Sequence, residues 1–285
     1  MKKILVTGAT GFIGNHVIAK LLQENYEVIA SSSNIEKAKT ATWFSWVKYI
    51  PFDLKDFDPN NDYTAYFDRP DLVIHLAWEG LPNYKAAFHV EENLPRHCAF
   101  LQNLISHGIT DLTVTGTCFE YGMQQGCLAE TLPTFPANSY AIAKDELRKQ
   151  LEKLQPQMNF NLKWVRLFYM YGSGQNPNSL LSQLDRALES GEKIFNMSGG
   201  EQERDYLHIQ QVAEYIVRIA LQNRVTGIIN CCSGAPVTVK TFVQNYLMEK
   251  QQDIQLNLGY YPYADYEPMS FWGDDKKLKS IINNE

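Results

Sequence analysis

A tyrosine and a lysine that stand four residues apart are the first candidates for chemistry in this chain. In SYAIAK they are Tyr140 and Lys144, and this spacing places both on one face of a helix. A free tyrosine has a pKa near about 10 and exchanges protons poorly at neutral pH. A lysine cation close by favours the phenolate and lowers that pKa. The pair therefore predicts a proton-exchanging Tyr140 tuned by Lys144; the alternative is a surface tyrosine beside a solvated lysine.

Three glycines lie between the first predicted strand and the helix that follows it. They are Gly8, Gly11 and Gly14 in TGATGFIG, residues 7–14. Gly8 permits a tight turn, Gly11 lets the backbone approach a pyrophosphate, and Gly14 lets the helix pack near the strand. The start of that helix then faces the phosphates with free N–H groups. The loop predicts a dinucleotide site; the alternative is three glycines in an ordinary turn.

The end of the second predicted strand is where an acid should bind the ribose hydroxyls of NAD, and it carries serines instead. The segment VIASSSNIEKAK places Ser31, Ser32 and Ser33 there, with Lys37 shortly after them. Without a carboxylate a 2′-phosphate is not repelled, and hydroxyls with a lysine offer it partners. The sequence therefore favours NADP(H), with NAD(H) as the alternative, and the serines could instead only cap the next helix.

Strands alternate with helices over the first 168 residues of the chain. The predicted strands are 3–7, 26–31, one within 46–54, 71–78, 111–116 and 160–168, and the predicted helices are 11–23, 34–41, 86–108 with a kink at Pro95, and 139–154. This alternation implies right-handed crossovers and a parallel sheet. The expected fold class is α/β, a Rossmann-type parallel sheet with helices on both faces.

After residue 168 the regular alternation breaks into loops, turns and short helices. We therefore expect a smaller C-terminal substrate domain, formed by 169–202 and 232–285. Residues 1–168 would form the dinucleotide-binding domain, and 203–231 would return to it. No linker rich in proline, glycine or serine separates the two parts, so they should be interleaved.

Composition excludes several classes of partner. A net charge of −6 and a pI near 5.6 argue against a nucleic-acid surface, which is basic. No run approaches 18 apolar residues, so we expect no membrane span. The five cysteines (98, 118, 127, 231 and 232) form no CxxC pair. We interpret them as reduced thiols of a cytoplasmic protein, and we predict no metal site.

The glycine spacing GxxGxxG and the later YxxxK pair resemble the extended branch of the short-chain dehydrogenase/reductase superfamily, the NAD-dependent epimerase/dehydratase family. The resemblance covers residue 3 to about 235. It places the catalytic hydroxyl four residues before the tyrosine of Tyr121-Gly122, which makes it Thr117. Thr117 would hold the substrate oxygen while Tyr140 exchanges the proton. Cys118 beside it is either a packed thiol or, given a basic partner, a nucleophile.

The same resemblance assigns the remaining site residues. Further cofactor contacts would come from Thr10, Phe12, Ile13, Asp53, Leu54, Leu76, Ala77, Trp78, Asn93, Thr115 and Phe168, together with Tyr140 and Lys144. Substrate contacts would come from Thr117, Phe119, Glu120, Tyr169, Asn178, Ser179, Leu180 and Arg204. Arg204 would bind the diphosphate, because a guanidinium suits forked phosphate contacts; the alternative is an internal salt bridge to Asp205.

The residues after Thr117 exclude two reactions of the family. Sugar dehydratases that resemble this chain carry Asp-Glu there, whereas this chain has Cys118 and Phe119. Elimination of water across C5 and C6 therefore lacks its acid and base. The epimerase-reductases that make GDP-fucose carry a cysteine two places after the hydroxyl, where this chain has Phe119, so ring epimerisation by that route is also disfavoured.

Three stretches, LAWEGLPNY (76–84), GTCFEYG (116–122) and FWGD (271–274), resemble the bacterial reductases of dTDP-4-keto-6-deoxyhexoses. The resemblance implies a homodimer that uses NADPH to reduce the C4 keto group of a nucleotide-activated, dTDP-linked 4-keto-6-deoxyhexose for a surface polysaccharide. Two alternatives stay open: a UDP-hexose 4-epimerase with tightly bound NAD, and a non-catalytic sensor that binds NADP(H). YEPMSFWGD (266–274) has no partner assignable from sequence.

Overall fold

The centre of the computed structural model, which describes residues 2–283, is a seven-stranded sheet in the order β12-β7-β5-β4-β1-β2-β3. Every neighbouring pair of strands in it is parallel. The strands are β1 (Lys3–Thr7), β2 (Glu27–Ser31), β3 (Lys48–Tyr49), β4 (Leu72–His75), β5 (Asp111–Thr117), β7 (Asn161–Leu167) and β12 (Gly227–Cys231). The predicted Rossmann-type α/β fold is confirmed.

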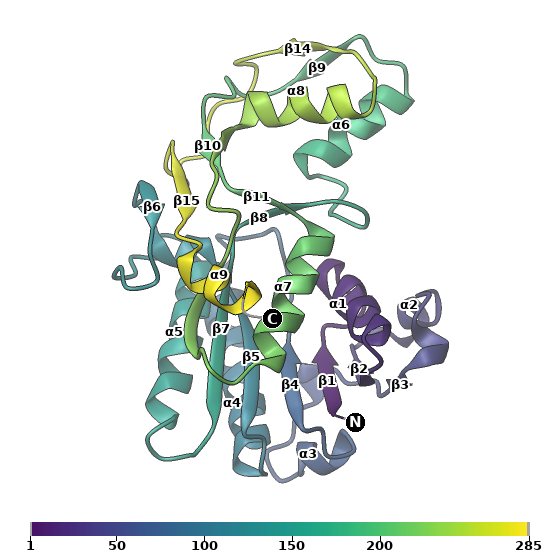
Figure 1. Cartoon of the computed structure of the whole chain (residues 1–285), viewed down its shortest axis with the longest axis vertical. Helices are drawn as coiled ribbons and strands as arrows, with labels where there is room; N and C mark the ends of the chain where they lie inside the picture. The colour runs from purple at the N-terminus through teal and green to yellow at the C-terminus, as the bar shows by residue number, and fades with distance from the viewer. Residues whose placement is uncertain (1, 284–285) are drawn as a thin grey trace.

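Helices cover both faces of this sheet because side chains alternate along each buried strand. In β1, Ile4 and Val6 belong to one apolar cluster, and Leu5 belongs to the other. The first cluster lies under α1 (Phe12–Gln23), α2 (Ile35–Lys39), α7 (Ile209–Leu221) and α9 (Lys276–Ile282). The second lies under α3 (Tyr63–Tyr66), α4 (Leu94–Ser106) and α5 (Ser139–Leu154). Figure 1 shows α1 and α7 on one side of the sheet.

Two predicted elements end or begin differently in the structure. The fourth strand stops at His75, and residues 76–78 continue as irregular backbone along the glycine loop. The long helix predicted at 86–108 begins with a π-helical turn, His89–Asn93, and continues as α4 with Pro95 in its first turn. Proline has no N–H to donate to the preceding turn, so the regular α-helical ladder starts around it.

A smaller lobe lies beyond the carboxyl ends of the sheet (Figure 1). It has its own apolar core between α6 (Leu180–Glu189), β9 (Ile194–Asn196), α8 (Val239–Glu249) and β14 (Gln255–Asn257). The predicted boundary of this lobe needs one change. Residues 232–285 do not all belong to it, because Leu278 and Ile281 of α9 pack into the core of the large sheet.

Short strand pairs connect the two lobes. The pairs are β8 (Tyr169–Tyr171) with β11 (Tyr206–His208), β10 (Glu203–Arg204) with β13 (Val237–Thr238), and β6 (Gly126–Leu128) with β15 (Phe271–Gly273). Three 3₁₀ turns lie within the large lobe: η1 (Phe44–Trp46), η2 (Leu54–Asp56) and η4 (Cys118–Tyr121). Segments far apart in sequence therefore meet at the carboxyl edge of the sheet.

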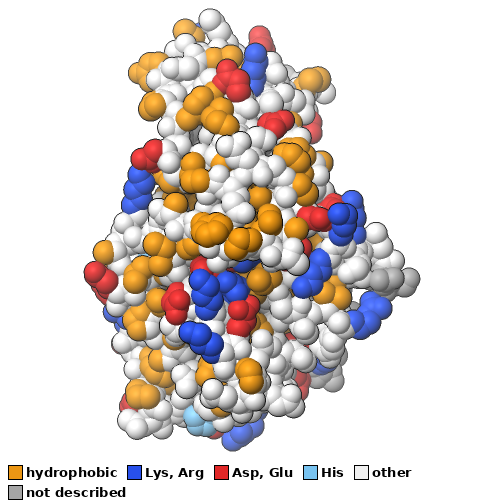
Figure 2. Space-filling view, turned by 90° about the vertical axis from the view of Figure 1, so that its left-hand side faces the viewer, with side chains coloured by type: hydrophobic (Ala, Val, Ile, Leu, Met, Phe, Trp, Pro, Cys, Tyr) orange, Lys and Arg blue, Asp and Glu red, His pale blue; other side chains and the backbone are white. Residues whose placement is uncertain are grey.

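The face of the molecule drawn in Figure 2 carries both signs of charge in small groups. Figure 2 shows lysine and arginine side chains next to aspartate and glutamate, with hydrophobic side chains scattered between them. Such a mixture does not concentrate the positive potential that a nucleic-acid backbone requires. Within residues 2–283 no helix is both long and apolar enough to cross a membrane. All five cysteines are free thiols.

Candidate active site

The loop between β1 and α1 forms a tight backbone cradle. Gly8 has a φ of +70°, and a Cβ atom there would lie 2.7 Å from the amide nitrogen of Ala77. Gly11 is the N-cap of α1, and as a glycine it has no side chain to cover the first N–H groups of that helix. These N–H groups and the positive end of the helix dipole suit a pyrophosphate. The cradle therefore fits a dinucleotide cofactor.

A cavity opens beside this cradle at the carboxyl ends of β1, β2 and β4. The predicted cofactor residues that line it are Gly8, Thr10, Gly11, Ser31, Ser32, Ser33, Lys37, Asp53, Leu54, Leu76, Ala77 and Trp78. Thr7, Phe52, Glu79 and Phe100 also line it and were not predicted. Thr7 ends the first strand and Phe52 precedes Asp53, so position alone could have indicated these two. Phe100 reaches the cavity from α4 by stacking on Phe52 at 5.5 Å, which sequence spacing does not reveal.

Some predicted cofactor residues lie elsewhere. Phe12 and Ile13 pack against the core beneath α1. Phe168 is buried in an apolar cluster with Cys118 and Phe271, and its contact with the cofactor stays a prediction. Asn93 donates to the carbonyl of cavity-lining Glu79 at 3.1 Å and thereby supports the wall rather than forming it.

The serines after β2 do not cap the following helix. That role belongs to Asn34, whose side-chain oxygen accepts from the N–H of Lys37 at 2.8 Å. The Ser32 hydroxyl lies 3.0 Å from the Tyr49 hydroxyl, which in turn donates to the Ser32 carbonyl at 2.8 Å. One of the three predicted hydroxyls is therefore already hydrogen-bonded within the protein.

The structure brings Thr117, Tyr140 and Lys144 together. Thr117 is the last residue of β5, and its hydroxyl lies close enough to the phenol of Tyr140 to lower the pKa of that phenol. Asn138 caps α5, and the N–H of Tyr140 in its first turn donates to the carbonyl of Tyr84 at 2.9 Å. The Lys144 ammonium donates to the carbonyl of Thr115 at 2.9 Å and lies 4.1 Å from the centre of the Trp78 ring. Local strand and helix ends thus place all three groups at one edge.

Burial dominates the electrostatics of this group. It raises the pKa of Tyr140 above its usual range; Tyr84, Glu120 and Cys118 raise it further, while the Thr117 hydrogen bond lowers it. We expected Lys144 to lower this pKa, but the net shift of Tyr140 is upward, and burial is its largest cause. Burial lowers the pKa of Lys144 itself to about 7, so its side chain is only partly protonated near neutral pH. The phenol is therefore held in its protonated form.

Cys118 has the surroundings of a packed thiol. It is buried with Tyr121, Leu128, Phe168, Cys232 and Phe271. Burial raises the pKa of its thiol, and the carboxylate of Glu267 adds to that rise. A nucleophilic cysteine requires the opposite shift. His75 and His97, which could serve as basic partners of a cysteine, are hydrogen-bonded to each other at 2.8 Å in the interior.

Aromatic side chains from three separate segments gather around Tyr140. The Tyr84 ring lies 5.6 Å from the Tyr140 ring and 5.2 Å from that of Phe119. Tyr266, from the C-terminal segment without an assigned partner, lies 6.1 Å from both Tyr84 and Phe119. Tyr84 and Tyr266 were not predicted, although Tyr84 is the last residue of the stretch LAWEGLPNY that carried the family resemblance. They line the side of the site where Phe119 was expected.

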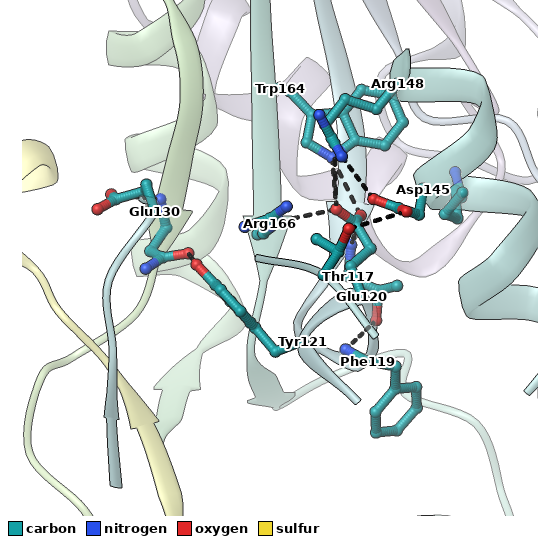
Figure 3. A network of polar contacts seen from close by, with 12 residues as sticks. Thr117, Phe119, Glu120, Tyr121, Glu130, Asp145, Arg148, Trp164 and Arg166 are labelled. Carbon is teal, nitrogen blue, oxygen red and sulfur yellow. Dashed lines mark hydrogen bonds and ion pairs between the residues drawn. The ribbon is translucent and has the colours of Figure 1, made fainter. Parts of the chain in front are cut away.

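Glu120 requires a correction, because it was predicted to contact the substrate. Its side chain is fully buried, and Figure 3 shows it pointing toward Trp164 and Arg166. It accepts from the indole N–H of Trp164 at 3.0 Å and from Nε of Arg166 at 2.7 Å. A carboxylate in this position cannot reach a sugar, and its role has to be sought inside the protein.

Arg204 and Asp205 have separate partners, so the salt bridge considered between them is not formed. The Arg204 guanidinium is buried, pairs with Glu267 at 3.0 Å and donates to the carbonyl of Glu203 at 2.8 Å. Asp205 accepts from the N–H groups of Ser233 and Gly234. Binding of the diphosphate by Arg204 stays a prediction, and Glu267 is a competitor for it.

The remaining predicted substrate residues lie in the loop before the small lobe. Ser179 is the N-cap of α6, Leu180 is its first residue, and Asn178 is exposed. Tyr169 lies at the start of β8, with its hydroxyl buried and its ring 6.4 Å from that of Phe119. Tyr169 therefore belongs to the aromatic side of the site, and the other three stay predictions.

Known proteins that resemble this chain over nearly its whole length act on nucleotide sugars, as their names state. A dTDP-6-deoxy-L-talose 4-dehydrogenase (NAD(+)) from Aggregatibacter actinomycetemcomitans is 28% identical over 95% of this chain and 98% of its own length. A GDP-6-deoxy-D-talose 4-dehydrogenase from the same organism is 26% identical over 99% of this chain and 92% of its own. The structure of a UDP-glucuronic acid 4-epimerase from Bacillus cereus, in complex with UDP-glucuronic acid and NAD, is 21% identical and superposes with a TM-score of 0.85, over 99% of this chain and 93% of that one.

These comparisons correct the predicted cofactor. The first of these relatives is named as an NAD(+) enzyme, and the epimerase structure holds NAD, so the preference for NADP(H) is wrong. The lack of a carboxylate after β2 does not by itself create a binding site for a 2′-phosphate. Absence of an anion removes repulsion, but a 2′-phosphate also needs cations, and Lys37 is the one cation among the predicted groups there.

The family of this chain is shown by a match to a family model as well as by these individual proteins. A family model described as "NAD dependent epimerase/dehydratase family" matches residues 4–232. The matched segment contains the glycine cradle, the cavity and the Thr117–Tyr140–Lys144 group. The chain therefore belongs to the NAD-dependent epimerase/dehydratase family and is an enzyme of nucleotide-sugar metabolism.

Proposed function

We propose that this enzyme interconverts the C4 hydroxyl and C4 keto groups of a nucleotide-activated 6-deoxyhexose, dTDP-linked by preference, with NAD(H). The observation that carries the proposal is the contact of Thr117 with Tyr140 next to the dinucleotide cavity. A bound nicotinamide supplies the chemistry of hydride transfer at sugar C4. The protein has to move the matching proton at sugar O4, and this group of residues is suited to that task.

Tyr140 is the proton-exchanging group. Burial keeps its phenol protonated at neutral pH, so it is prepared to donate to O4 when a ketone is reduced. In the oxidising direction it must accept the O4 proton, which favours that direction at higher pH. Thr117 holds O4 within reach through its hydroxyl. Lys144, beneath the cavity wall formed by Trp78, would hold the nicotinamide ribose when the cofactor is bound.

The residues around the sugar support a 6-deoxy substrate. Phe119, Tyr84 and Tyr266 present an aromatic wall beside Tyr140. An apolar wall suits a C6 methyl group, whereas a C6 hydroxyl or carboxylate would need polar partners. The position after Cys118 carries no acid or base for dehydration. Two relatives whose names specify 6-deoxytalose nucleotides point the same way.

The test is to supply the purified enzyme with substrates for both directions. Oxidation would use dTDP-6-deoxy-L-talose with NAD⁺, and reduction would use dTDP-4-keto-6-deoxyglucose with NADH, each followed by the absorbance of reduced nicotinamide. NADPH and NADP⁺ run in parallel. We expect one equivalent of NADH to change per sugar, and NMR of the product gives the configuration at C4. The proposal would be overturned if the absorbance of reduced nicotinamide stayed constant with every 6-deoxy sugar tested.

A 4-epimerase is the second candidate, because the solved structure with a TM-score of 0.85 is a 4-epimerase. The two activities share the Thr117–Tyr140–Lys144 group and differ in what the cofactor does over a full cycle. An epimerase copurifies with NAD and produces no net NADH. Conversion of UDP-glucose or UDP-glucuronic acid without net NADH would therefore favour it.

A further inference from the structure

Glu120 is a fully buried carboxylate directly behind the catalytic edge. Its two oxygens accept hydrogen bonds from three N–H groups. These are the backbone N–H of Thr117 at 2.9 Å, the indole N–H of Trp164 and the Nε–H of Arg166 at 2.7 Å. An ionised carboxylate is an acceptor on both oxygens, so this arrangement fits the charged form. Figure 3 shows the bonds converging on it from the strand and helix around it.

The counter-ions of Glu120 are unequal. Arg166 is also fully buried and lies with its guanidinium carbon 4.4 Å from the centre of the Tyr121 ring. Arg148 lies farther away, with its Nε 3.9 Å from Glu120, and it is bound at 2.6 Å to both Asp145 and Glu152. Glu120 and Arg166 therefore form a closely matched pair, and removing either charge leaves the other uncompensated.

This pair is joined to the catalytic threonine by a short rigid turn. Glu120 accepts the Thr117 N–H, and the Thr117 hydroxyl oxygen accepts the N–H of Phe119, which closes a capping box. Gly116 leaves the necessary room, because a Cβ atom there would lie 2.7 Å from Cε2 of Trp164. The backbone of Thr117 is thus fixed from behind while its hydroxyl faces Tyr140.

The carboxylate also acts on the charge of the catalytic pair. The titratable groups that interact electrostatically with Tyr140 or Lys144 are Tyr84, Cys118, Glu120, His75, His89 and His97. Burial lowers the pKa of His75 to about 3 and also lowers those of His89 and His97, so these rings are neutral. Glu120 raises the pKa of both Tyr140 and Lys144. It is the anion common to the two.

We propose that Glu120 is a positioning residue that fixes Thr117 through its backbone and sets, through its charge, the pH at which Tyr140 exchanges a proton. It does not touch the sugar or the cofactor. The inference deepens the proposed function and rests on it in one respect, because the proton exchanged is the one at sugar O4.

The test compares the pH profile of kcat in the oxidising direction. Glu120→Gln removes the anion, lowers the pKa of Tyr140 and should move the rising limb to lower pH by about one unit or more. Arg166→Gln leaves Glu120 unopposed and should move the limb to higher pH. The double variant removes both charges and should bring the limb back toward its wild-type position, although kcat stays reduced because Thr117 is less firmly held.

Asp111→Asn is the matched control. Asp111 of β5 is a buried carboxylate paired with Lys163 of β7 at 2.7 Å, near the amino ends of these strands, whereas Glu120 follows the carboxyl end of β5. Thr117 lies six positions after Asp111 along the strand, which is about 20 Å. The Asp111→Asn variant should be less stable than the wild type, and the rising limb of its pH profile of kcat should stay in place. A limb that stays in place in folded Glu120→Gln and Arg166→Gln, or moves equally in Asp111→Asn, overturns the inference.

Failure of the proposed function is a separate outcome. If the wild-type enzyme turns over no nucleotide sugar, Tyr140 can be titrated directly by NMR with ring-labelled tyrosine, assigned through Tyr140→Phe. A lower titration midpoint of Tyr140 in Glu120→Gln then supports the role of Glu120 whatever the substrate. An unchanged midpoint overturns it.

Discussion

A buried carboxylate–cation pair lies near each end of the neighbouring strands β5 and β7, the second one through Glu120 of the turn η4 that follows β5, and the two pairs have different roles. At the amino end, Asp111 of β5 pairs with Lys163 of β7, and the same ammonium donates to the carbonyl of Ala220 at the end of α7. At the carboxyl end, Glu120 pairs with Arg166 and with the backbone of Thr117. The first pair joins the sheet to a helix. The second joins it to the reacting group.

This difference follows from the geometry of parallel sheets. Chains leave the carboxyl ends of the strands into loops that form the site, whereas the amino ends are entered from the opposite side. A buried charge at the carboxyl end is therefore felt by any group that exchanges protons there. A buried charge at the amino end influences only folding. Two buried carboxylate–cation pairs of similar chemistry therefore differ in function according to the end of the strand at which they lie.

The largest expected effect is at the carboxyl end, in Tyr140→Phe. Loss of the proton-exchanging hydroxyl should lower kcat by about 10²–10⁴, because general acid–base catalysis contributes that much. Affinity for NAD⁺, measured by fluorescence titration, should change little, since the ring and Lys144 remain. Tyr84→Phe is the control: it removes a neighbouring phenol and should cost much less. Near-full activity of Tyr140→Phe would reject the assignment.

The second prediction concerns stability at the amino end. Asp111→Asn leaves the Lys163 ammonium buried without its anion, and the free energy of unfolding should fall by about 3–5 kcal/mol. Denaturant unfolding measures this loss, and kcat measured on the folded enzyme should stay at the wild-type value. A large fall in kcat at full occupancy of the folded state would mean that the two ends are coupled, and the comparison would fail.

Local spacing predicted much of the site, and long-range contacts were its limit. The glycine loop and the pair Tyr140–Lys144 could be predicted because the spacing along one element fixes their geometry. The side chain of Glu120 could not be placed, because a single 3₁₀ turn decides whether it faces the sugar or Arg166, and Arg166 lies on another strand. The fold needed only the alternation of strands and helices. The meeting of Tyr84 with Tyr266 depends on how the two lobes close together.

The third prediction compares the two buried lysines of these ends. Lys163 has a carboxylate partner, whereas Lys144 is held by a carbonyl and the Trp78 ring. Lys163→Met should destabilise the protein because it strands Asp111. Lys144→Met should stabilise it near neutral pH, because it removes the burial cost of an ammonium. The change in the free energy of unfolding in Lys163→Met and in Lys144→Met should not exceed the loss in Asp111→Asn.

The pH dependence gives the sharper measurement. The pKa of Lys144 is lowered to about 7 in the folded protein, so between that pH and its ordinary value the unfolded chain binds more protons. Stability of the wild type should therefore rise with pH across this window, relative to Lys144→Met. The advantage of Lys144→Met should shrink as pH increases. An advantage that is constant with pH would mean that Lys144 keeps an ordinary pKa.

The smallest expected effect is that of Cys118, which lies at the carboxyl end yet takes no part in proton exchange. Burial raises the pKa of its thiol, and its neighbours are apolar, so Cys118→Ala should keep kcat within about twofold and cost about 1 kcal/mol of stability. Alkylation offers a matched comparison within the chain, because Cys127 is exposed. Iodoacetamide should modify Cys127 first, with activity retained, while Cys118 reacts only on unfolding. Loss of activity in folded Cys118→Ala, or modification of Cys118 before Cys127, would show that the thiol is part of the chemistry, and proximity to the carboxyl edge alone would then suffice to involve a buried group.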